Sequence, residues 1–230
     1  MHNIHWHKIS IFILLFIFCL KAKGQQNLPL YDLRPAHFGF GIIFGSGKLK
    51  TTLSDEFHLQ DTILHIRNNG FPQVGIAGLI SLKLTNHLDF RFAPGLTLAQ
   101  RNMDFVFPDR TDNVVIETVS FDLPFLFKYK SDRIKNTRFY VVGGLRYSFD
   151  YQSDELTERG PFKQLVPLKK QQLSYEFGVG LDIYTDYFKF SPEIKMSNGL
   201  NNVLSKDEYI YTGAFDGIFT RLFNVTMFFE

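Results

Sequence analysis

The chain has 230 residues, 26 of them Phe and 10 Tyr, with a single Cys and a formal net charge of +2. An aromatic content of 16% excludes a disordered chain, and one Cys excludes a disulfide scaffold. The near-neutral charge argues against a nucleic-acid-binding protein, and the mean hydropathy of -0.06 argues against a helical membrane bundle.

The first 24 residues have the features of a secretory signal peptide. Lys8 precedes an apolar run over residues 9–20, and small residues at Ala22 and Gly24 predict cleavage after Gly24. The run is too short to span a bilayer as a mature helix. An uncleaved anchor is the alternative; a lipoprotein is disfavoured because bulky residues precede Cys19. The exported chain is expected to use no thiol chemistry.

Beyond residue 36 the dominant pattern is strict alternation of apolar and polar or small residues, which is typical of strands whose two faces meet different environments. Eight such runs are predicted as strands: 38–45, 74–84, 88–98, 118–129, 138–150, 173–183, 188–196 and 219–229.

The connections between these runs alternate in length. Long polar connections are expected at 48–71, 99–114, 152–171 and 198–217, tight turns at 85–87 and 184–187, and an intermediate turn at 130–137. Alternating long and short connections between strands of about ten residues are typical of transmembrane β-barrels. The sequence therefore predicts an all-β, eight-stranded antiparallel barrel of the outer-membrane type. Its domains are a signal peptide (1–24), a periplasmic segment (25–35) and the barrel (36–230).

The polar faces of the runs favour a membrane barrel over a soluble lipocalin-like barrel, which is the structural alternative. They hold many small residues, including Gly41, Gly144 and Gly180, which weaken a solvent-facing strand but leave room in a crowded lumen. Proline within three runs suggests local bulges, at Pro94, Pro124 and Pro192.

Charged residues recur at mid-height on the faces expected to point inward. Opposite charges on facing walls of a narrow lumen should pair, because an unpaired buried charge is costly. We therefore expect a structural network that fills the lumen, with a proton or substrate pathway as the alternative. Its members are Arg91, Asp122, Arg146, Glu176 and Glu193.

No pattern of residues indicates catalysis. His58 and His65 share one long loop with acidic residues and Ser54, but no nucleophile motif, metal-ligand spacing or phosphate-binding loop accompanies them. We expect no catalytic residue, metal or cofactor, and no small-molecule substrate or nucleic acid as partner.

Two surface segments are candidates for contacts with partner proteins. The loop over 198–217 carries more apolar residues than a solvated loop should expose, so it either covers the barrel mouth or contacts a partner. Its expected contact residues are Leu204, Tyr209, Ile210 and Tyr211. The basic turn at 130–138 is a second candidate, for an acidic partner, although a solvated charged turn is the commoner explanation of such a pattern.

Four segments resemble one known family. Residues 27–32 (NLPLYD) with 37–40 (HFGF), and residues 189–197 (KFSPEIKMS) with 199–202 (GLNN), are similar to the PorT proteins of the type IX secretion system. The resemblance implies a non-enzymatic protein of the outer membrane that supports export of cargo proteins, in contact with membrane lipid and other secretion subunits. Outer-membrane barrels usually end in an aromatic residue, whereas here Phe229 is followed by Glu230.

Two other functions remain compatible with the same pattern of strands. One is an OmpA- or OmpX-like barrel that stabilises the envelope or adheres through its loops. The other is a lipid-modifying barrel enzyme that uses the loop histidines.

Overall fold

A computed structural model describes residues 27–54, 65–68, 70–106, 108, 109, 111–151, 168–205 and 215–230. The expected signal peptide lies outside the described residues. For β2, and for residues 101–103, 105 and 112–117 of β5 and β6, only the backbone is described.

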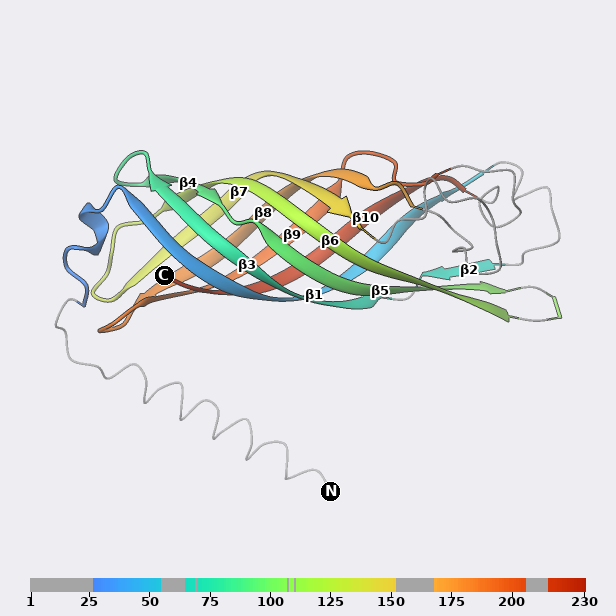
Figure 1. Cartoon of the computed structure of the whole chain (residues 1–230), viewed down its shortest axis with the longest axis horizontal. Helices are drawn as coiled ribbons and strands as arrows, with labels where there is room; N and C mark the ends of the chain where they lie inside the picture. Colours follow the sequence, from blue (N-terminus) through green and yellow to red (C-terminus); the bar gives the residue numbers. More distant parts are fainter. Residues whose placement is uncertain are drawn as a thin grey trace, which may run out of the picture.

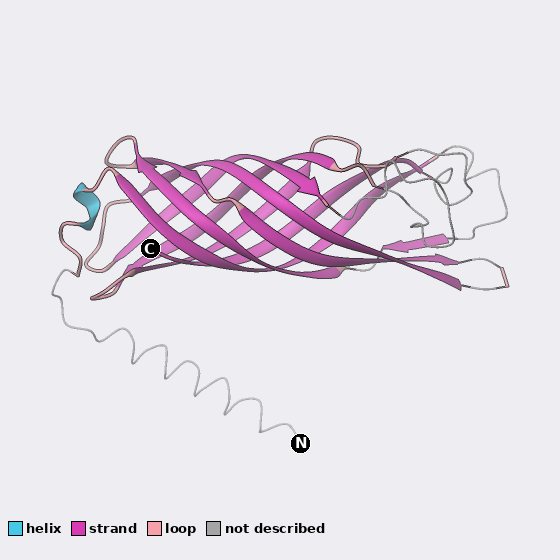
Figure 2. Cartoon of the chain, in the orientation of Figure 1, coloured by secondary structure: helices cyan, strands magenta, loops and turns pink. Residues whose placement is uncertain are grey.

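The described chain is almost entirely antiparallel strand, with one short 3-10 helix (Figure 2). No described helix has the length and apolar character needed to cross a membrane. The elements are η1 (Tyr31–Leu33), β1 (Ala36–Leu53), β2 (His65–Asn68), β3 (Phe71–Lys83), β4 (Leu88–Phe92), β5 (Gly95–Val106), β6 (Thr111–Lys130), β7 (Thr137–Asp150), β8 (Gln171–Tyr184), β9 (Lys189–Gly199) and β10 (Phe215–Phe229).

The sheet closes on itself because β1 pairs with β10 on one edge and with β3 on the other. The ten segments occupy eight positions around the ring. β4 and β5 share one position, since both pair with β3 on one side and with β6 on the other, and β2 pairs with β5 beyond the start of β3. The strands wind obliquely around a long axis (Figure 1). The all-β antiparallel barrel expected from the sequence is confirmed.

The expectation of bulges at the three prolines is wrong. The strand that contains Pro94 is interrupted, since proline has no N–H to donate, but its register against β3 and β6 is the same on both sides of the gap. Pro124 and Pro192 also lie in strands whose register does not shift. In the described ladders, a shift occurs between Thr52 and Leu53, near the end of β1.

The connection expected at 99–114 is mostly strand. β5 and β6 pair without interruption from Gly95↔Asp122 to Val106↔Thr111, and this hairpin extends far along the barrel axis (Figure 1). Residues 114–116 are β-branched, which favours strand over loop. We call this end the long-loop end. The opposite end, with η1 and the turns at 84–87, 131–136 and 185–188, is the short-turn end.

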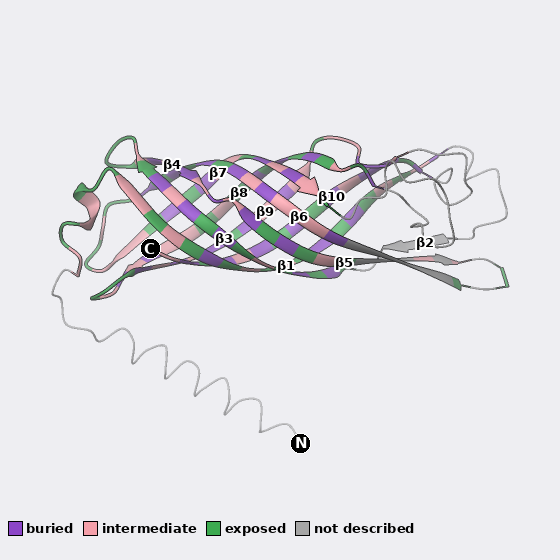
Figure 3. Cartoon of the chain, in the orientation of Figure 1, coloured by how far each residue is buried: buried purple, intermediate pink, exposed green. Residues whose placement is uncertain are grey.

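Burial alternates along the strands whose side chains are described (Figure 3). Large apolar side chains are exposed on the outer wall, among them Phe40, Ile76, Leu98, Phe125 and Phe177. Buried positions include many Arg, Lys, Asp, Glu and Ser, together with apolar side chains such as Leu79, Leu126 and Phe228. This distribution is the reverse of a soluble barrel and matches a lipid-facing wall.

Candidate functional site

The lumen contains a network of ion pairs centred on Arg91 of β4. Its guanidinium is fully buried, with Nη1 2.6 Å from Oε2 of Glu193 and Nη2 3.5 Å from Oε1 of Glu230. Glu230 is also 2.8 Å from Nζ of Lys189, and Glu193 is 3.4 Å from Nζ of Lys195. Each carboxylate thus contacts two cations.

Two further pairs lie between Arg91 and the short-turn end. Nζ of Lys128 donates to both carboxylate oxygens of Asp182, at 2.7 and 2.8 Å, and Ser191 donates to the same carboxylate at 2.7 Å. Nζ of Lys130 donates to Asp89 at 2.6 Å. These short, charge-assisted contacts satisfy groups that would be costly to bury alone.

A looser group lies on the long-loop side of Arg91. Oε1 of Glu176 is 3.5 Å from Nη1 of Arg146, and its Oε2 is 3.5 Å from Nζ of Lys195. Asp122 is buried and accepts a hydrogen bond from Thr97 at 2.9 Å, with no ion pair to Arg146 among the described contacts.

The structure therefore places all five residues expected in the lumen network inside the barrel, but four of them belong to the connected ion pairs. Seven further buried charges lie outside the expected set: Lys128, Lys130 and Glu230, together with Asp89, Asp182, Lys189 and Lys195. Lys128 and Lys130 alternate with Phe127 and Tyr129, which are exposed on the outer wall, so the alternation in the sequence assigns both lysines to the inward face. Across the described barrel, six cations and six carboxylates are buried: Arg91, Lys128, Lys130, Arg146, Lys189 and Lys195 with Asp89, Asp122, Glu176, Asp182, Glu193 and Glu230.

Side chains fill much of the remaining lumen. Tyr140 occupies the space left by Gly180, where an added Cβ would lie 2.2 Å from the ring. The same ring stacks under Nζ of Lys128, 3.6 Å from its centroid. Two cavities beside Asp122 and Arg146 have volumes of only about 30 and 20 Å³, enough for one or two waters each.

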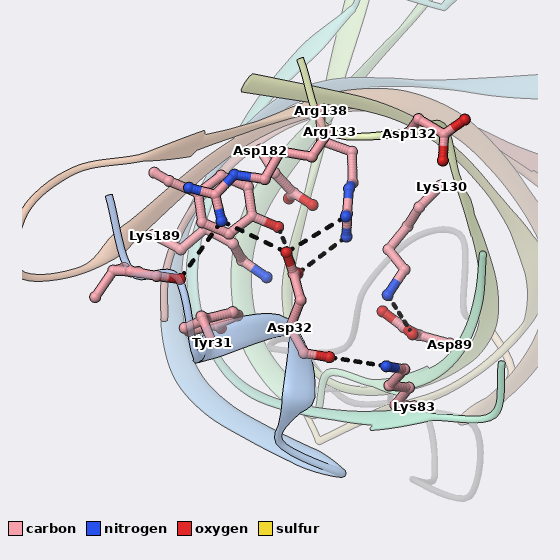
Figure 4. A network of polar contacts seen from close by, with 12 residues as sticks. Tyr31, Asp32, Lys83, Asp89, Lys130, Asp132, Arg133, Arg138, Asp182 and Lys189 are labelled. Carbon is pink, nitrogen blue, oxygen red and sulfur yellow. Dashed lines mark hydrogen bonds and ion pairs between the residues drawn. The ribbon is translucent and has the colours of Figure 1, made fainter. Parts of the chain in front are cut away.

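The segment 27–35 crosses the short-turn end of the barrel (Figure 4). We call it the strap. Its anchor is Asp32, whose carboxylate accepts hydrogen bonds from Arg138 and Tyr184, both at 3.0 Å, and contacts Arg133 at 3.5 Å. Burial alone would raise the pKa of Asp32, but Arg138, Tyr184 and Arg133 outweigh burial and hold that pKa below its ordinary value.

The preceding residue of the strap reaches the lumen network. The ring of Tyr31 stacks on His37 with centroids 4.0 Å apart, and its hydroxyl donates to Glu230 at 3.2 Å. Burial raises the pKa of Tyr31, and the negative charge of Glu230 raises it further. The strap is thus joined through Glu230 to Arg91 and Lys189.

The basic turn expected to be a docking surface contacts its own chain instead. Arg133 donates to the backbone oxygen of Asn27 in the strap as well as to Asp32, and Lys130 pairs inside the lumen. Lys135 remains exposed in this turn, in a left-handed conformation with φ of 56°. Asp89 and Asp32 therefore already pair with three of the four cations of this turn.

The long-loop end carries a small apolar cap. Leu168 pairs with Leu204 across an isolated bridge, Val203 donates its N–H to Ile218, and these side chains are buried. Leu204 is only 1% exposed, so it serves the fold rather than offering a contact to a partner. The other expected contact residues, Tyr209, Ile210 and Tyr211, lie outside the described residues.

The histidines form no catalytic arrangement among the described side chains. His37 lies under Tyr31, and Nε2 of His87 is 3.9 Å from exposed Asp132. His58 and the side chain of His65 lie outside the described residues. The described part of the chain contains no group of three or more His, Cys, Asp or Glu placed to hold a metal ion.

Comparisons with solved structures find other bacterial barrels. The chain is 13% identical to the N-terminal β-barrel domain of OprF from Pseudomonas aeruginosa, with a TM-score of 0.36 and coverage of 82% of this chain and 96% of that one. It is 9% identical to the outer membrane protein OprG of Pseudomonas aeruginosa, with a TM-score of 0.45 and coverage of 84% and 91%. No curated protein sequence matches the chain.

The family comparison covers most of the chain. The model of the outer membrane protein beta-barrel domain matches residues 26–205, which run from the strap through β9. The closed sheet, the apolar outer wall and the ion-paired lumen fit that description. The chain therefore belongs to the outer membrane protein β-barrel domain family and is a β-barrel protein of the outer membrane.

Proposed function

We propose that this protein is a non-enzymatic component of a type IX protein secretion system, which supports export of cargo through contacts with other subunits. The observation that carries the proposal is the filled lumen, in which ion pairs, Tyr140 and the strap occupy the space that a transported molecule would need. An eight-stranded barrel is only wide enough for its own side chains. Function must then reside on the outer surfaces.

The resemblance to the PorT proteins supports the secretion system named here. Three of the four resembling segments meet at the short-turn end. Tyr31 of the strap stacks on His37, and Nζ of Lys189, at the start of β9, lies 4.7 Å from the centroid of the same Tyr31 ring. These segments, separated by about 150 residues in the sequence, form one structural unit.

Two surfaces are available for subunit contacts. Short turns of outer-membrane barrels face the periplasm, so we expect the strap to lie on that side. The outer side of the strap exposes Leu30 and Leu33, and the neighbouring turn exposes Tyr187 at 91%. The long-loop end, which carries the apolar cap, would face the cell exterior.

Deletion of the gene tests the proposal directly. We expect cargo to accumulate inside the cell while the outer membrane keeps its resistance to detergents and bile salts. Normal cargo secretion with a fragile envelope would instead indicate an OmpA- or OmpX-like structural barrel. His58→Ala with His65→Ala should leave both secretion and lipid composition unchanged; altered lipids would indicate a barrel enzyme.

Complementation then locates the contact surface. Deleting residues 206–211 alters only the long-loop end, and Leu30→Ser with Leu33→Ser alters only the strap. Phe127→Leu, on the lipid-facing wall, is the matched control for both. Each variant must first show normal insertion into the membrane. We expect this of the loop deletion, because loops tolerate shortening. If all three variants restore export fully, neither surface is the contact site.

A further inference from the structure

The outer wall carries a trough that the secretion proposal does not use. It lies across β6 to β10, near the short-turn end, between two rows of outward side chains. Strand register places the first row side by side across five strands: Tyr129, Val141, Val179, Ile194 and Val225. Three of its members are Val and a fourth is Ile, all short and β-branched.

The second row lies two residues closer to the short-turn end. It consists of Ser131, Phe139, Leu181 and Pro192, of which Ser131 and Pro192 extend little from the wall. The floor between the rows is formed at Tyr140, Gly180 and Glu193, whose side chains point into the lumen or are absent. The resulting hollow has a volume of about 610 Å³, within the range of about 300–1,000 Å³ typical of ligand sites.

Larger side chains border the trough on both sides. Register places Phe177, Met196 and Phe223 next to the first row on the side of the long-loop end. Ile183, Phe190 and Phe229 lie on the other side, next to the second row. Five neighbouring strands span about 19 Å at roughly 4.8 Å a step, so the trough is long and narrow.

The environment and the ends of the trough indicate what occupies it. It opens on the lipid-facing wall, where the bordering Phe residues hold bulk lipid away from the floor of the trough. A flexible hydrocarbon chain that lies in the trough gains dispersion contacts with that floor, which bulk lipid does not make. Its short-turn end has polar groups at the Tyr129 and Ser131 positions, beside the turn that exposes Lys135. Tyrosine and lysine at this level are typical of the membrane–water interface.

We propose that this trough binds one fatty acyl chain of a phospholipid of the periplasmic leaflet, with the lipid phosphate beside Lys135. The proposal rests on the membrane location of the barrel and is independent of the secretion system. A hydrophobic segment of a partner protein is the competing occupant, and the test distinguishes the two.

Native mass spectrometry of the barrel purified from outer membranes in mild detergent tests the occupant. We expect one retained phospholipid per barrel. Val141→Phe with Val179→Phe fills the trough and should abolish that retained mass. Ile76→Phe with Leu145→Phe places the same ring on outward positions elsewhere and should retain it. Heat-modifiable migration on gels verifies that each variant is folded.

A second measurement tests the position of the phosphate. Lys135→Asn keeps a residue that tolerates the left-handed backbone and removes the charge. Titrated with phosphatidylglycerol in detergent, it should bind several-fold more weakly, whereas Lys50→Asn at the other end should bind like the original protein. Unchanged binding by Lys135→Asn overturns the phosphate position. A wild-type barrel without lipid, or a trough variant that keeps its lipid and loses a co-purifying protein, overturns the acyl-chain proposal.

Discussion

Replacing Arg91 by Met is expected to lower the free energy of unfolding of the barrel by about 3 kcal/mol. The side chain is fully buried, and its guanidinium contacts the carboxylates of Glu193 and Glu230. Methionine has similar length and no charge, so the variant removes the cation with little change in volume. The two carboxylates then lose a shared partner in a site of low dielectric.

The magnitude follows from the contacts that remain. Removing one member of a buried ion pair costs about 3–5 kcal/mol when the other charge is left alone. Here Glu193 keeps Lys195 at 3.4 Å and Glu230 keeps Lys189 at 2.8 Å. Neither carboxylate is left without a cation, so the loss should fall at the lower end of that range.

Urea unfolding in lipid vesicles, followed by β-type circular dichroism, measures the difference. Phe127→Leu is the control, because its side chain faces lipid that accepts either residue, and it should cost less than about 1 kcal/mol. Adding Glu193→Gln to Arg91→Met should recover about half of the loss, since it removes the unbalanced charge. Equal losses for Arg91→Met and Phe127→Leu would refute the assignment of inner and outer faces.

Four further results are expected. Gly180→Ala should lower the free energy of unfolding by about 1–3 kcal/mol, because the added Cβ would meet the Tyr140 ring at 2.2 Å. Gly143→Ala is the control and should be tolerated, since the nearest atom to its added Cβ is 3.8 Å away. Equal effects of the two variants in urea unfolding would contradict this. Asp32→Asn should speed amide exchange over residues 27–35 without unfolding the barrel. The pKa of Asp32 lies below its ordinary value of 3.8 when the strap is bound. Amide protection of the strap should therefore be constant above about pH 5 and decline below about pH 4, as the carboxyl gains a proton. Protection that persists at pH 2 would argue against this anchor. Extracted protein should migrate faster on gels before heating than after, as closed barrels do, and a helical circular dichroism spectrum would contradict the fold.

The sequence by itself determined the barrel and its faces. Apolar residues alternate with polar or small residues in segments such as 88–98 and 173–183, because one face of each strand meets lipid and the other meets a crowded lumen. This alternation is a local property of each strand. The same alternation placed Arg91, Arg146, Glu176 and Glu193 inside. The predicted ends of the strands were less accurate, since residues 100–106 form strand only because their backbone groups pair with those of residues 111–117.

Which charges meet was decided by the tertiary structure alone. Arg91 lies on β4 and pairs with Glu193 on β9 and with Glu230 after β10, a choice set by barrel closure and by register between strands distant in the sequence. The strap gave no periodic signal, and its anchor exists because Asp32 meets Arg138 and Tyr184 across the barrel mouth. Alternation fixes the face on which a side chain lies, because it depends only on the pleat of one strand. The partner depends on how eight strands close into a ring, which no single strand encodes.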